Sequence, residues 1–434
     1  MSDRRLELRS FDVEAVDFGD RTALDGRRLV ISKSEIAALA SADPAFTGVD
    51  VQLVRRGEAA RIPQITDVVE PRTKSGGTGG VFPGLLSPVE PAGTGRTDRL
   101  RGVAVVTSGE VPWLGAKGLF VAHDSVLDTA GPGADLHPYA DLHLVVLRFS
   151  FAEGVDHEGY ERALLLAGEK VARALALAAR DAEPTATETR ELRAADAGLP
   201  RIAYVYQVQS QGVFLRSRLY GRILDELMPT LVHPNELADG ALTSGGLGGH
   251  GAKMHTWMHQ NNAIVERLLA GHGTRWDFAG VILHRGHCYI YEDKQRVALR
   301  IAEAATLLGA QGALFTLGGA GNNVTEVMLA IQECERRGIK TVLITWEHAG
   351  PDGSDYPLPF AVPEAVAIVS TGNLDEALEL PAMERIVGAS AIRARPEIGG
   401  VPFPIDRAIQ LERRTFYAGA ANPLGFGRSG SAES

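Results

Sequence analysis

The chain has 434 residues, of which 45% are hydrophobic and 23% charged, and its formal net charge is −10. This length predicts two or three domains with ample apolar material for a core, which excludes a single small module and a mostly disordered chain. The acidic balance, 44 Lys and Arg against 54 Asp and Glu, argues against nucleic acid as a partner.

Cysteine content and apolar segments predict a cytoplasmic protein. Cys288 and Cys334 are the only cysteines, too few for a framework of disulfides. The N-terminus, MSDRRLELR, lacks the apolar region of a signal peptide. No apolar run approaches the ~20 residues that cross a bilayer, so we expect no membrane association.

The first hundred residues are expected to form a mixed or antiparallel β region. Short stretches at 6–9, 29–32 and 51–54 alternate apolar and polar residues, as half-buried strands do. Residues 63–95 are rich in Pro and Gly, which predicts a long loop.

Residues 101–235 are expected to form an α/β region. The predicted elements are strands at 102–107, 142–149 and 202–208, and a long helix at 156–180. Residues 181–200 have the composition of a linker or an exposed excursion, so we place a boundary near them.

From residue 236 to the end we expect a Rossmann-like α/β domain. The predicted elements are strands at 278–283, 313–317, 340–345 and 365–370, and helices at 292–308 and 322–337. Strands that alternate with single helices predict a parallel sheet flanked by helices, in which ligands bind outside the carboxyl ends of strands. The last sixteen residues, rich in Gly and Ser, are expected to be a mobile tail.

A glycine-rich turn, LGGAGNN at 317–323, joins a predicted strand to a predicted helix. Backbone N–H groups and the helix dipole favour an anion at such a place, so Gly318, Gly319, Gly321 and Asn322 are candidate substrate-binding residues. The alternative is a tight turn that Asn322 caps. The spacing is not GxGxxG, and no acidic residue follows a second strand at the expected position, which argues against a nicotinamide site.

Several sequence blocks, in the same order, resemble one protein family as far as about residue 388. They are RIPQITDVVEPR at 61–72, GVFPG at 80–84, GVAVVT at 102–107, HQNN at 259–262, the Gly318 turn, GIKTVLIT at 338–345, STGN at 370–373 and ELP at 379–381. This pattern is similar to the alpha-type subunit of component B of the glycine/sarcosine/betaine reductases.

The resemblance implies a subunit that presents a small N-substituted acetate to a beta-type subunit carrying selenocysteine or cysteine. In the family that partner attacks the α-carbon and expels the amine, and the two-carbon unit passes through a selenoprotein A to a component C that makes acetyl phosphate. For substrates with a free amine, the alpha-type subunit cleaves itself before a cysteine that becomes a pyruvoyl group. The pyruvoyl carbonyl then forms a Schiff base with the amine.

This chain departs from the family at the cleavage point, because it carries no cysteine there. The expected position lies between Asp239 and His259, where residues 242–255 read LTSGGLGGHGAKMH. Both cysteines of the chain lie beyond this stretch. We therefore expect an uncleaved chain without a pyruvoyl cofactor, and the alternative is a pyruvoyl formed from Ser244.

A betaine-like substrate would need no Schiff base, because a quaternary ammonium is already a good leaving group. We therefore expect a role in reductive C–N cleavage, with His259 and Glu347 as candidate catalytic residues and Gln260 and Asn261 as substrate-binding residues. The alternatives are a non-catalytic structural subunit that stabilises the beta-type partner, and a diverged complex with different C–X bond chemistry. The glycine-rich segments 75–95 and 240–251 are expected near the contact with that partner.

Histidine spacing raises one more alternative, a divalent metal. His255 and His259 are four residues apart and would share a helix face. The plainer interpretation is that these side chains only form hydrogen bonds around the glycine-rich stretch, so no metal is expected. The other candidate ligands, which follow predicted strands, are His284, His287, Glu347 and His348.

Overall fold

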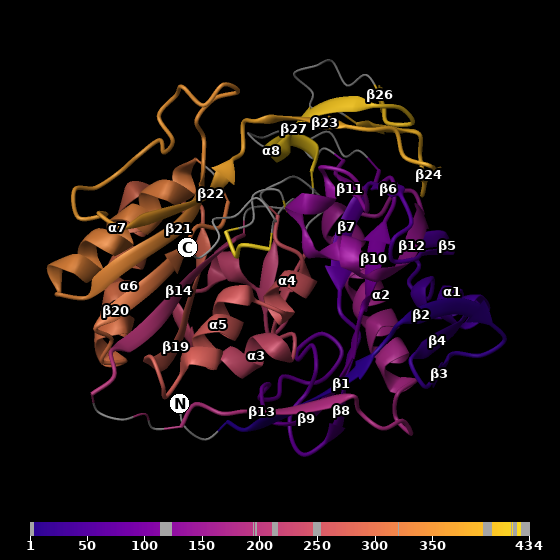
Figure 1. The fold of residues 1–434 in the computed structure, drawn as a ribbon, viewed down its shortest axis with the longest axis horizontal. Helices are drawn as coiled ribbons and strands as arrows, with labels where there is room; N and C mark the ends of the chain where they lie inside the picture. Colours follow the sequence, from indigo (N-terminus) through magenta and orange to yellow (C-terminus); the bar gives the residue numbers. More distant parts are fainter. Residues whose placement is uncertain are drawn as a thin grey trace.

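The computed structural model describes residues 4–112, 124–193, 195, 198–210, 216–245, 253–319, 321–393, 402–417, 419 and 423–426. In this part of the chain, N-terminal strands and C-terminal strands stand side by side, and the helices α3 (Pro234–Ala238), α4 (Thr256–Gln260) and α5 (Ala263–Gly271) lie between them (Figure 1). No helix of the described residues is long and apolar enough to cross a membrane.

The N-terminal half contains several small sheets. The first, in spatial order, has β13 (Ala186–Arg190), β1 (Leu6–Asp12), β9 (Gly95–Arg101) and β8 (Arg72–Gly76). The second has β5 (Phe46–Val54), β12 (His143–Phe151), β10 (Val103–Ser108) and β7 (Ile65–Val69). Smaller elements are β2 (Ala15–Gly19), β3 (Ala23–Asp25), β4 (Arg28–Ser32), α1 (Lys33–Ala40), β6 (Ala60–Pro63) and β11 (Val126–Asp128).

These sheets are mixed, because β1 pairs with β9 in parallel and β10 with β12 in parallel, whereas β7 pairs with β10 antiparallel. The prediction of a loop over 63–95 is wrong for its first part, which forms β7 and β8. The run ITDVV has the β-branched residues of a strand, and its backbone groups find partners in β10. The expected linker over 181–200 likewise contains β13, an exposed strand that pairs with β1.

Helix α2 (His157–Leu177), a stretch that the sequence predicted as a long helix over 156–180, covers the second sheet. Asp156 caps its N-terminus by accepting a hydrogen bond from the N–H of Gly159 at 2.8 Å. Its apolar face, which includes Leu164, Val171 and Leu175, is buried in the core of this half.

The C-terminal half is built on a six-stranded sheet over the described residues. In spatial order its strands are β17 (Thr230–Val232), β19 (Asp277–Gly286), β14 (Arg201–Gln209), β20 (Gly312–Thr316), β21 (Lys340–Glu347) and β22 (Ile368–Asn373). All pairs are parallel except that of β17 with β19, so the predicted parallel sheet is present.

Helices cover both faces of this sheet. On β14, Tyr204 and Tyr206 face the core that contains α5, whereas Ala203 and Val205 face the core that contains α6 (Tyr291–Leu307) and α7 (Asn322–Arg336). Figure 1 shows the sheet between α5 on one side and α6 and α7 on the other. The connection from β14 to β19 therefore covers one face of the sheet, and the connections that follow β19 and β20 cover the other face. The carboxyl ends of β14 and β20 lie at the resulting switch point, where ligands of open α/β sheets bind.

The chain after β22 returns to the N-terminal half. The strand β24 (Arg385–Ile386) pairs with β6, and the hydroxyl oxygen of Tyr417 accepts a hydrogen bond from the N–H of Asp128 at 2.8 Å. The remaining elements are β15 (Ser217–Leu219), β16 (Arg222–Ile223), β18 (Leu242–Ser244), β23 (Ala377–Leu380), β25 (Ala391–Arg393), β26 (Pro402–Pro404), β27 (Ile409–Glu412) and α8 (Arg413–Phe416). Contacts thus cross the boundaries expected at 100 and 235, while most of the expected C-terminal tail lies outside the described residues.

Candidate functional site

The Gly318 turn lies at the carboxyl end of β20, beside the end of β14. The N–H of Gly318 donates to the side-chain oxygen of Gln207 at 3.1 Å, and the Asn323 amide donates to the carbonyl of Gly318. The N-cap of α7 is Gly321, without a side-chain cap, and Asn322 is exposed in the first turn. The alternative in which Asn322 caps the helix is therefore wrong.

The glycines of this turn pack closely against the chain itself. A Cβ on Gly318 would lie 2.3 Å from the carbonyl oxygen of Gln207. Gly319 has a φ of +93°, and its Cβ would lie 2.0 Å from the Asn323 amide nitrogen. Any side chain at Gly319 would therefore strain the turn itself, whether or not a ligand binds there. Anion binding at this turn stays a prediction.

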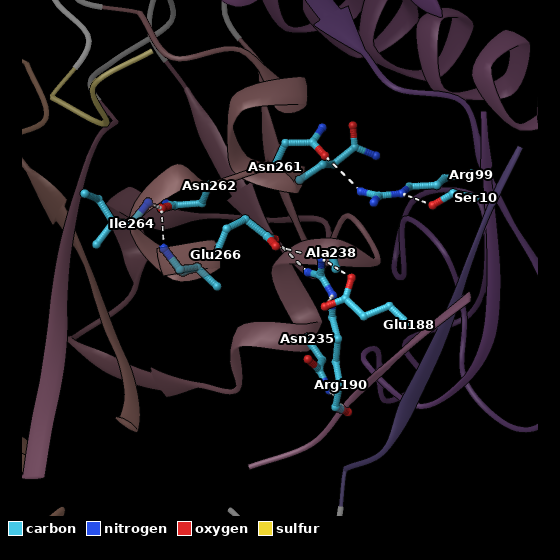
Figure 2. Close-up of polar contacts among 12 residues, drawn as sticks. Ser10, Arg99, Glu188, Arg190, Asn235, Ala238, Asn261, Asn262, Ile264 and Glu266 are labelled. Atoms are coloured by element: carbon cyan, nitrogen blue, oxygen red, sulfur yellow. Dashed lines mark hydrogen bonds and ion pairs between the residues drawn. The ribbon is translucent and has the colours of Figure 1, made fainter. Parts of the chain in front are cut away.

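The HQNN motif holds neighbouring segments together. The Nδ1 of His259 lies 2.7 Å from the hydroxyl of Tyr206, and the Gln260 side-chain oxygen accepts from the N–H of Glu70 at 3.0 Å. Asn262 caps α5 by accepting from two backbone N–H groups, one of them that of Ile264 (Figure 2).

Asn261 faces a group of arginines. Its side-chain oxygen accepts from Arg72 at 2.8 Å and lies 3.4 Å from the Nη1 of Arg99, the second contact being visible in Figure 2. In the same view Arg190 lies between Glu188 and Glu266, to which it is bonded. The amides of Gln260 and Asn261, both predicted to touch substrate, are thus engaged inside the chain.

The structure attaches the two predicted groups of site residues to different faces of β14. Tyr206 bonds His259, whereas the next residue, Gln207, bonds Gly318, and successive side chains of a strand point to opposite faces. Glu347 ends β21, beyond β20 from β14, and is partly exposed.

No three His, Cys, Asp or Glu side chains of the described residues are grouped so as to hold a metal ion. The Nδ1 of His255 lies 2.9 Å from the Tyr139 hydroxyl, and that of His284 lies 3.0 Å from the carbonyl oxygen of Arg285. Burial lowers the pKa of His259 to about 3, with Lys253 acting in the same direction, so its imidazole is neutral at pH 7.

Both cysteines are buried in the core around α6 and α7. Burial raises the pKa of Cys288 to about 11 and that of Cys334 to about 12, which keeps both as unreactive thiols at neutral pH.

A set of buried ionisable side chains that the sequence did not reveal lies between α2, β7, β15 and the start of α4. We call it the Lys253 cluster, and its members are Asp67, Glu161, Glu169, Arg216, Arg218 and Lys253. Each except Arg216 is less than 9% exposed, and the Arg216 side chain is 13% exposed. Burying so many charges is costly, so such clusters are candidates for functional sites.

Asp67 and Lys253 lie at the centre of the cluster. Asp67 accepts from the N–H of Thr256 at 2.9 Å and from its hydroxyl at 2.6 Å, while the Lys253 amine donates to the Thr66 carbonyl. Burial raises the pKa of Asp67 to about 6, and the nearby Lys253 opposes this rise. Burial also lowers the pKa of Lys253, which Asp67 and Glu161 oppose.

Glu169 is completely buried in α2, and neither carboxyl oxygen has a hydrogen-bond partner within the described part of the chain. Burial, together with the charge of Asp67, raises its pKa well above the ordinary value. Burial therefore favours the protonated, neutral form of this carboxyl group.

A small pocket opens beside the cluster at the carboxyl end of β14. Its free space is about 10 Å³, enough for one water-sized group. Gln209 borders both this pocket and the Gly318 turn, since a Cβ on Gly319 would lie 2.9 Å from the Gln209 amide carbon. The pocket therefore lies at the switch point of the sheet. Its lining residues are Val208, Gln209, Arg216, Ser217, Ser244, Gly245, Lys253 and Met254.

Two of these cluster residues had a detectable sequence signal. Asp67 interrupts the apolar strand ITDVV, and Glu169 falls on the apolar stripe of α2, four residues after Leu165. A charge at a predicted core position indicates either a function or a buried partner, but it does not say which partner.

Comparison with known proteins shows the family of the chain. The sequence profile of glycine/sarcosine/betaine reductase component B subunits matches residues 4–432. The chain belongs to this family. Its alpha-type resemblance blocks, including HQNN and the Gly318 turn, therefore mark a family relationship that spans nearly the whole chain.

Three relatives illustrate the range of the family. The chain is 33% identical over 433 residues to the glycine reductase complex component B subunits alpha and beta of Acetoanaerobium sticklandii, with 98% of each chain covered. It is 35% identical over 390 residues to the sarcosine reductase complex component B subunit alpha of Peptoclostridium acidaminophilum, covering 88% of this chain and 89% of the relative. It is 34% identical over 408 residues to the betaine reductase component B subunit alpha of that organism, covering 91% and 90%. No solved structure matches the chain.

Proposed function

We propose that the chain is the substrate-specific subunit of a reductase complex, and that it presents a small betaine-like acetate to a beta-type subunit. The selenolate or thiolate of that partner would attack the α-carbon, and the C–N bond would break with its electron pair leaving on the amine. Family membership supports the general role. The observation that carries the proposal is the buried Lys253 cluster beside a pocket at the switch point, an arrangement that a purely structural subunit does not need.

A quaternary ammonium substrate fits the missing cysteine. The sequence has no cysteine between Asp239 and Asn262, and residues 246–252 of this interval lie outside the described residues. Without a pyruvoyl carbonyl the chain cannot activate a primary amine as a Schiff base. The amine must then leave without that help, and trimethylamine leaves a quaternary ammonium more easily than ammonia leaves a primary amine. In this proposal the C-terminal sheet and its helices act as a Rossmann-like ligand-binding unit, in which His259, Glu347 and the Gly318 turn remain candidate site residues.

Ligand binding can be measured by thermal shift with four acetates that differ only in N-methylation. We expect betaine to raise the melting temperature of the purified chain most, followed by dimethylglycine, with sarcosine and glycine having little effect. A larger shift with glycine than with betaine would contradict the betaine-like preference.

Intact mass tests the absence of processing. We expect one uncut chain of 46.3 kDa after expression and purification. Two fragments that divide between residues 239 and 262, with a carbonyl reducible by borohydride, would show that Ser244 or another residue forms a pyruvoyl.

Assembly with the beta-type subunit is the remaining part of the proposal. The glycines of segments 75–95 and 240–251 are partly explained within the chain, since a Cβ on Gly84 would lie 2.2 Å from the Tyr220 carbonyl oxygen and one on Gly240 would lie 2.6 Å from the Phe82 ring. The loop still exposes Val89, which is 75% accessible. We expect Val89→Glu to weaken co-purification with the beta-type subunit, whereas Leu307→Glu on α6 should not. Equal recovery with both variants would place the interface elsewhere.

A further inference from the structure

The loop between β19 and α6 is held in a strained conformation by buried charges. His287 has a φ of +80°, which is uncommon for a residue other than glycine. The buried carboxylate of Glu326 accepts from the N–H of His287 at 2.7 Å and from that of Cys288. The amine of Lys294 pairs with Glu326 and donates to the carbonyl of Cys288, each at 2.7 Å. Backbone strain that the surroundings hold in place concentrates at functional sites.

This fixed loop leaves three large side chains exposed in a row. Tyr289, Ile290 and Tyr291 are 68%, 52% and 53% exposed. Single exposed apolar residues are normal, but adjoining ones mark interaction surfaces. Because the backbone before them is fixed, these side chains are presented in one arrangement.

A second loop with exposed aromatic residues follows β21. It comprises residues 348–367 and extends beyond the sheet (Figure 1). Tyr356 is 91% exposed, and Phe360 is 38% exposed. The loop is tied at its base, because the N–H of His348 donates to the carbonyl of Pro357 at 2.7 Å. A loop of this length that has no strand or helix of its own is usually functional or disordered, and this one is ordered.

Both loops leave the same edge of the C-terminal sheet, because β19 and β21 are parallel strands of it. The Gly318 turn follows β20, which lies between them, and a Cβ on Gly286 would lie 2.9 Å from the carbonyl oxygen of Gly318. This is the edge at which open α/β sheets bind ligands. We call the exposed side chains of the two loops the Tyr289 patch, and its members are Tyr289, Ile290, Tyr291, Tyr356 and Phe360.

The charged residues around the Tyr289 patch are acidic. Glu292, Asp352 and Asp355 are exposed, and within the described part of the chain none of them forms an ion pair. Neither segment 287–293 nor segment 349–364 contains a Lys or Arg. Contact between this surface and the same surface of a second copy would bring like charges together, which is unfavourable. The patch therefore fits a different chain, one that offers apolar pockets bordered by Lys and Arg.

We propose that the Tyr289 patch is the docking surface for the beta-type subunit. The inference rests on the proposed function, in which the nucleophile of that subunit must reach a substrate at this edge of the sheet. Tyrosines bury a large area at a small loss of side-chain entropy, and both loops are already ordered, so little free energy is spent on ordering them. The Val89 contact proposed above belongs to another loop and is tested by another variant.

Binding of the purified beta-type subunit to the tethered chain, followed by biolayer interferometry, measures docking. We expect Tyr289→Ser and Tyr356→Ser each to weaken binding at least about tenfold, as truncation of a central aromatic contact does. The matched control is Leu307→Ser, because Leu307 is 85% exposed at the far end of α6. That variant should bind as the unmodified chain does. Equal binding by all three variants overturns the docking surface.

Charge reversal tests the chemistry of the partner. Asp355→Lys is expected to slow association with the beta-type subunit and to reduce the dependence of the association rate on salt, because a carboxylate that attracts Lys and Arg is replaced by a cation. Faster association of this variant would show that the partner surface is acidic and would overturn the proposal.

Tyrosine nitration tests the surface without any variant. Tetranitromethane is expected to modify Tyr289, Tyr291 and Tyr356 in the free chain, and most of this modification should be lost when the beta-type subunit is bound. Equal modification of the free chain and the complex contradicts docking at this patch. A free chain that is dimeric by light scattering and becomes monomeric with Tyr356→Ser would assign the patch to a second copy, which also overturns the proposal.

The thermal shift with betaine separates this inference from the proposed function. If betaine stabilises the chain and the beta-type subunit binds the Tyr variants unchanged, the docking surface is wrong while the proposed function stands. If the Tyr variants alone lose the subunit and betaine gives no shift, the docking surface stands and the betaine-like substrate is wrong. A beta-type subunit that does not bind the unmodified chain overturns both proposals.

Discussion

At the scale of single residues, buried histidines link the stability of the chain to pH. His259 is completely buried, and its pKa of about 3 lies far below the ordinary 6.5. Below pH 6.5 the unfolded chain therefore takes up a proton that the folded chain refuses, so stability is lost as the pH falls from 6.5 toward 3. His137 and His284 have a pKa lowered by burial to about 4 and act in the same direction.

Substitution of His259 tests this linkage. At pH 5 the neutral imidazole costs about 2 kcal/mol of the free energy of unfolding relative to pH 7.5. We expect His259→Gln to lose less stability than the unmodified chain between these pH values, as measured by urea unfolding. Asp67, whose raised pKa works in the opposite direction between about 4 and 6, is common to both proteins and cancels in the comparison. An identical pH dependence would mean that His259 titrates normally.

Two neighbouring substitutions in the Gly318 turn are expected to differ sharply. Gly318→Ala places a methyl group against the backbone of Gln207, so the turn must shift at a cost of about 1–3 kcal/mol in unfolding free energy. Asn322→Ala changes an exposed residue that caps nothing and should cost less than about 0.5 kcal/mol. Urea unfolding of both variants measures the two losses of unfolding free energy. A large loss with Asn322→Ala would contradict the statement that Asn322 caps nothing.

At the scale of elements, one buried ion pair joins β6, β11 and the returning C-terminal chain. Arg61 forms two hydrogen bonds of 2.7 Å with Asp128, both side chains being fully buried. The same guanidinium donates to the carbonyls of Ile405 and Pro381, each at 2.9 Å. A single residue of the N-terminal half thus fixes two points of the C-terminal segment.

Removal of this arginine is expected to be severe. Arg61→Met leaves Asp128 buried without its cation, which typically costs about 3–5 kcal/mol. The control is Arg28→Met, because Arg28 pairs with Asp17 at the surface with 58% of its side chain exposed, and such pairs contribute less than about 1 kcal/mol. Similar unfolding free energies for both variants would contradict the structural role of Arg61.

At the scale of the whole molecule, the C-terminal segment completes the N-terminal core. Leu378, Leu380 and Ile405 are buried against Val126 and Leu136 in one apolar cluster. A chain that ends at Asn373 would expose this surface and leave Arg61 without its carbonyl partners.

We therefore expect the truncated chain to unfold at lower temperature than the full chain and to be cleaved faster by protease within residues 60–130. Calorimetry and limited proteolysis of the two chains measure these effects. A truncated chain with the melting temperature of the full chain would show that its two parts fold independently.

The sequence by itself determined the features that depend on local pattern. Periodicities of two and 3.6 residues were enough to locate β14, β19, β20 and β21 and the helices between them. The apolar residues of one strand or helix recur at a regular spacing within that segment, so no distant segment is needed to recognise it. The order of motifs along the chain was enough to indicate the family and to show that no cysteine stands at the expected cleavage point.

Tertiary structure alone decided which polar residues meet. Asp67 bonds Thr256 across 189 positions of sequence, and Glu161 of helix α2 meets Arg218 of strand β15. Substrate binding by Gln260 and Asn261 stays a prediction, but only the folded chain shows that their side chains contact Glu70 and Arg72. A side chain's partner depends on which distant segments pack together, and local pattern carries no information on that choice. Apolar burial therefore could be predicted from the sequence, whereas the compensation of buried charge in the Lys253 cluster required the folded chain.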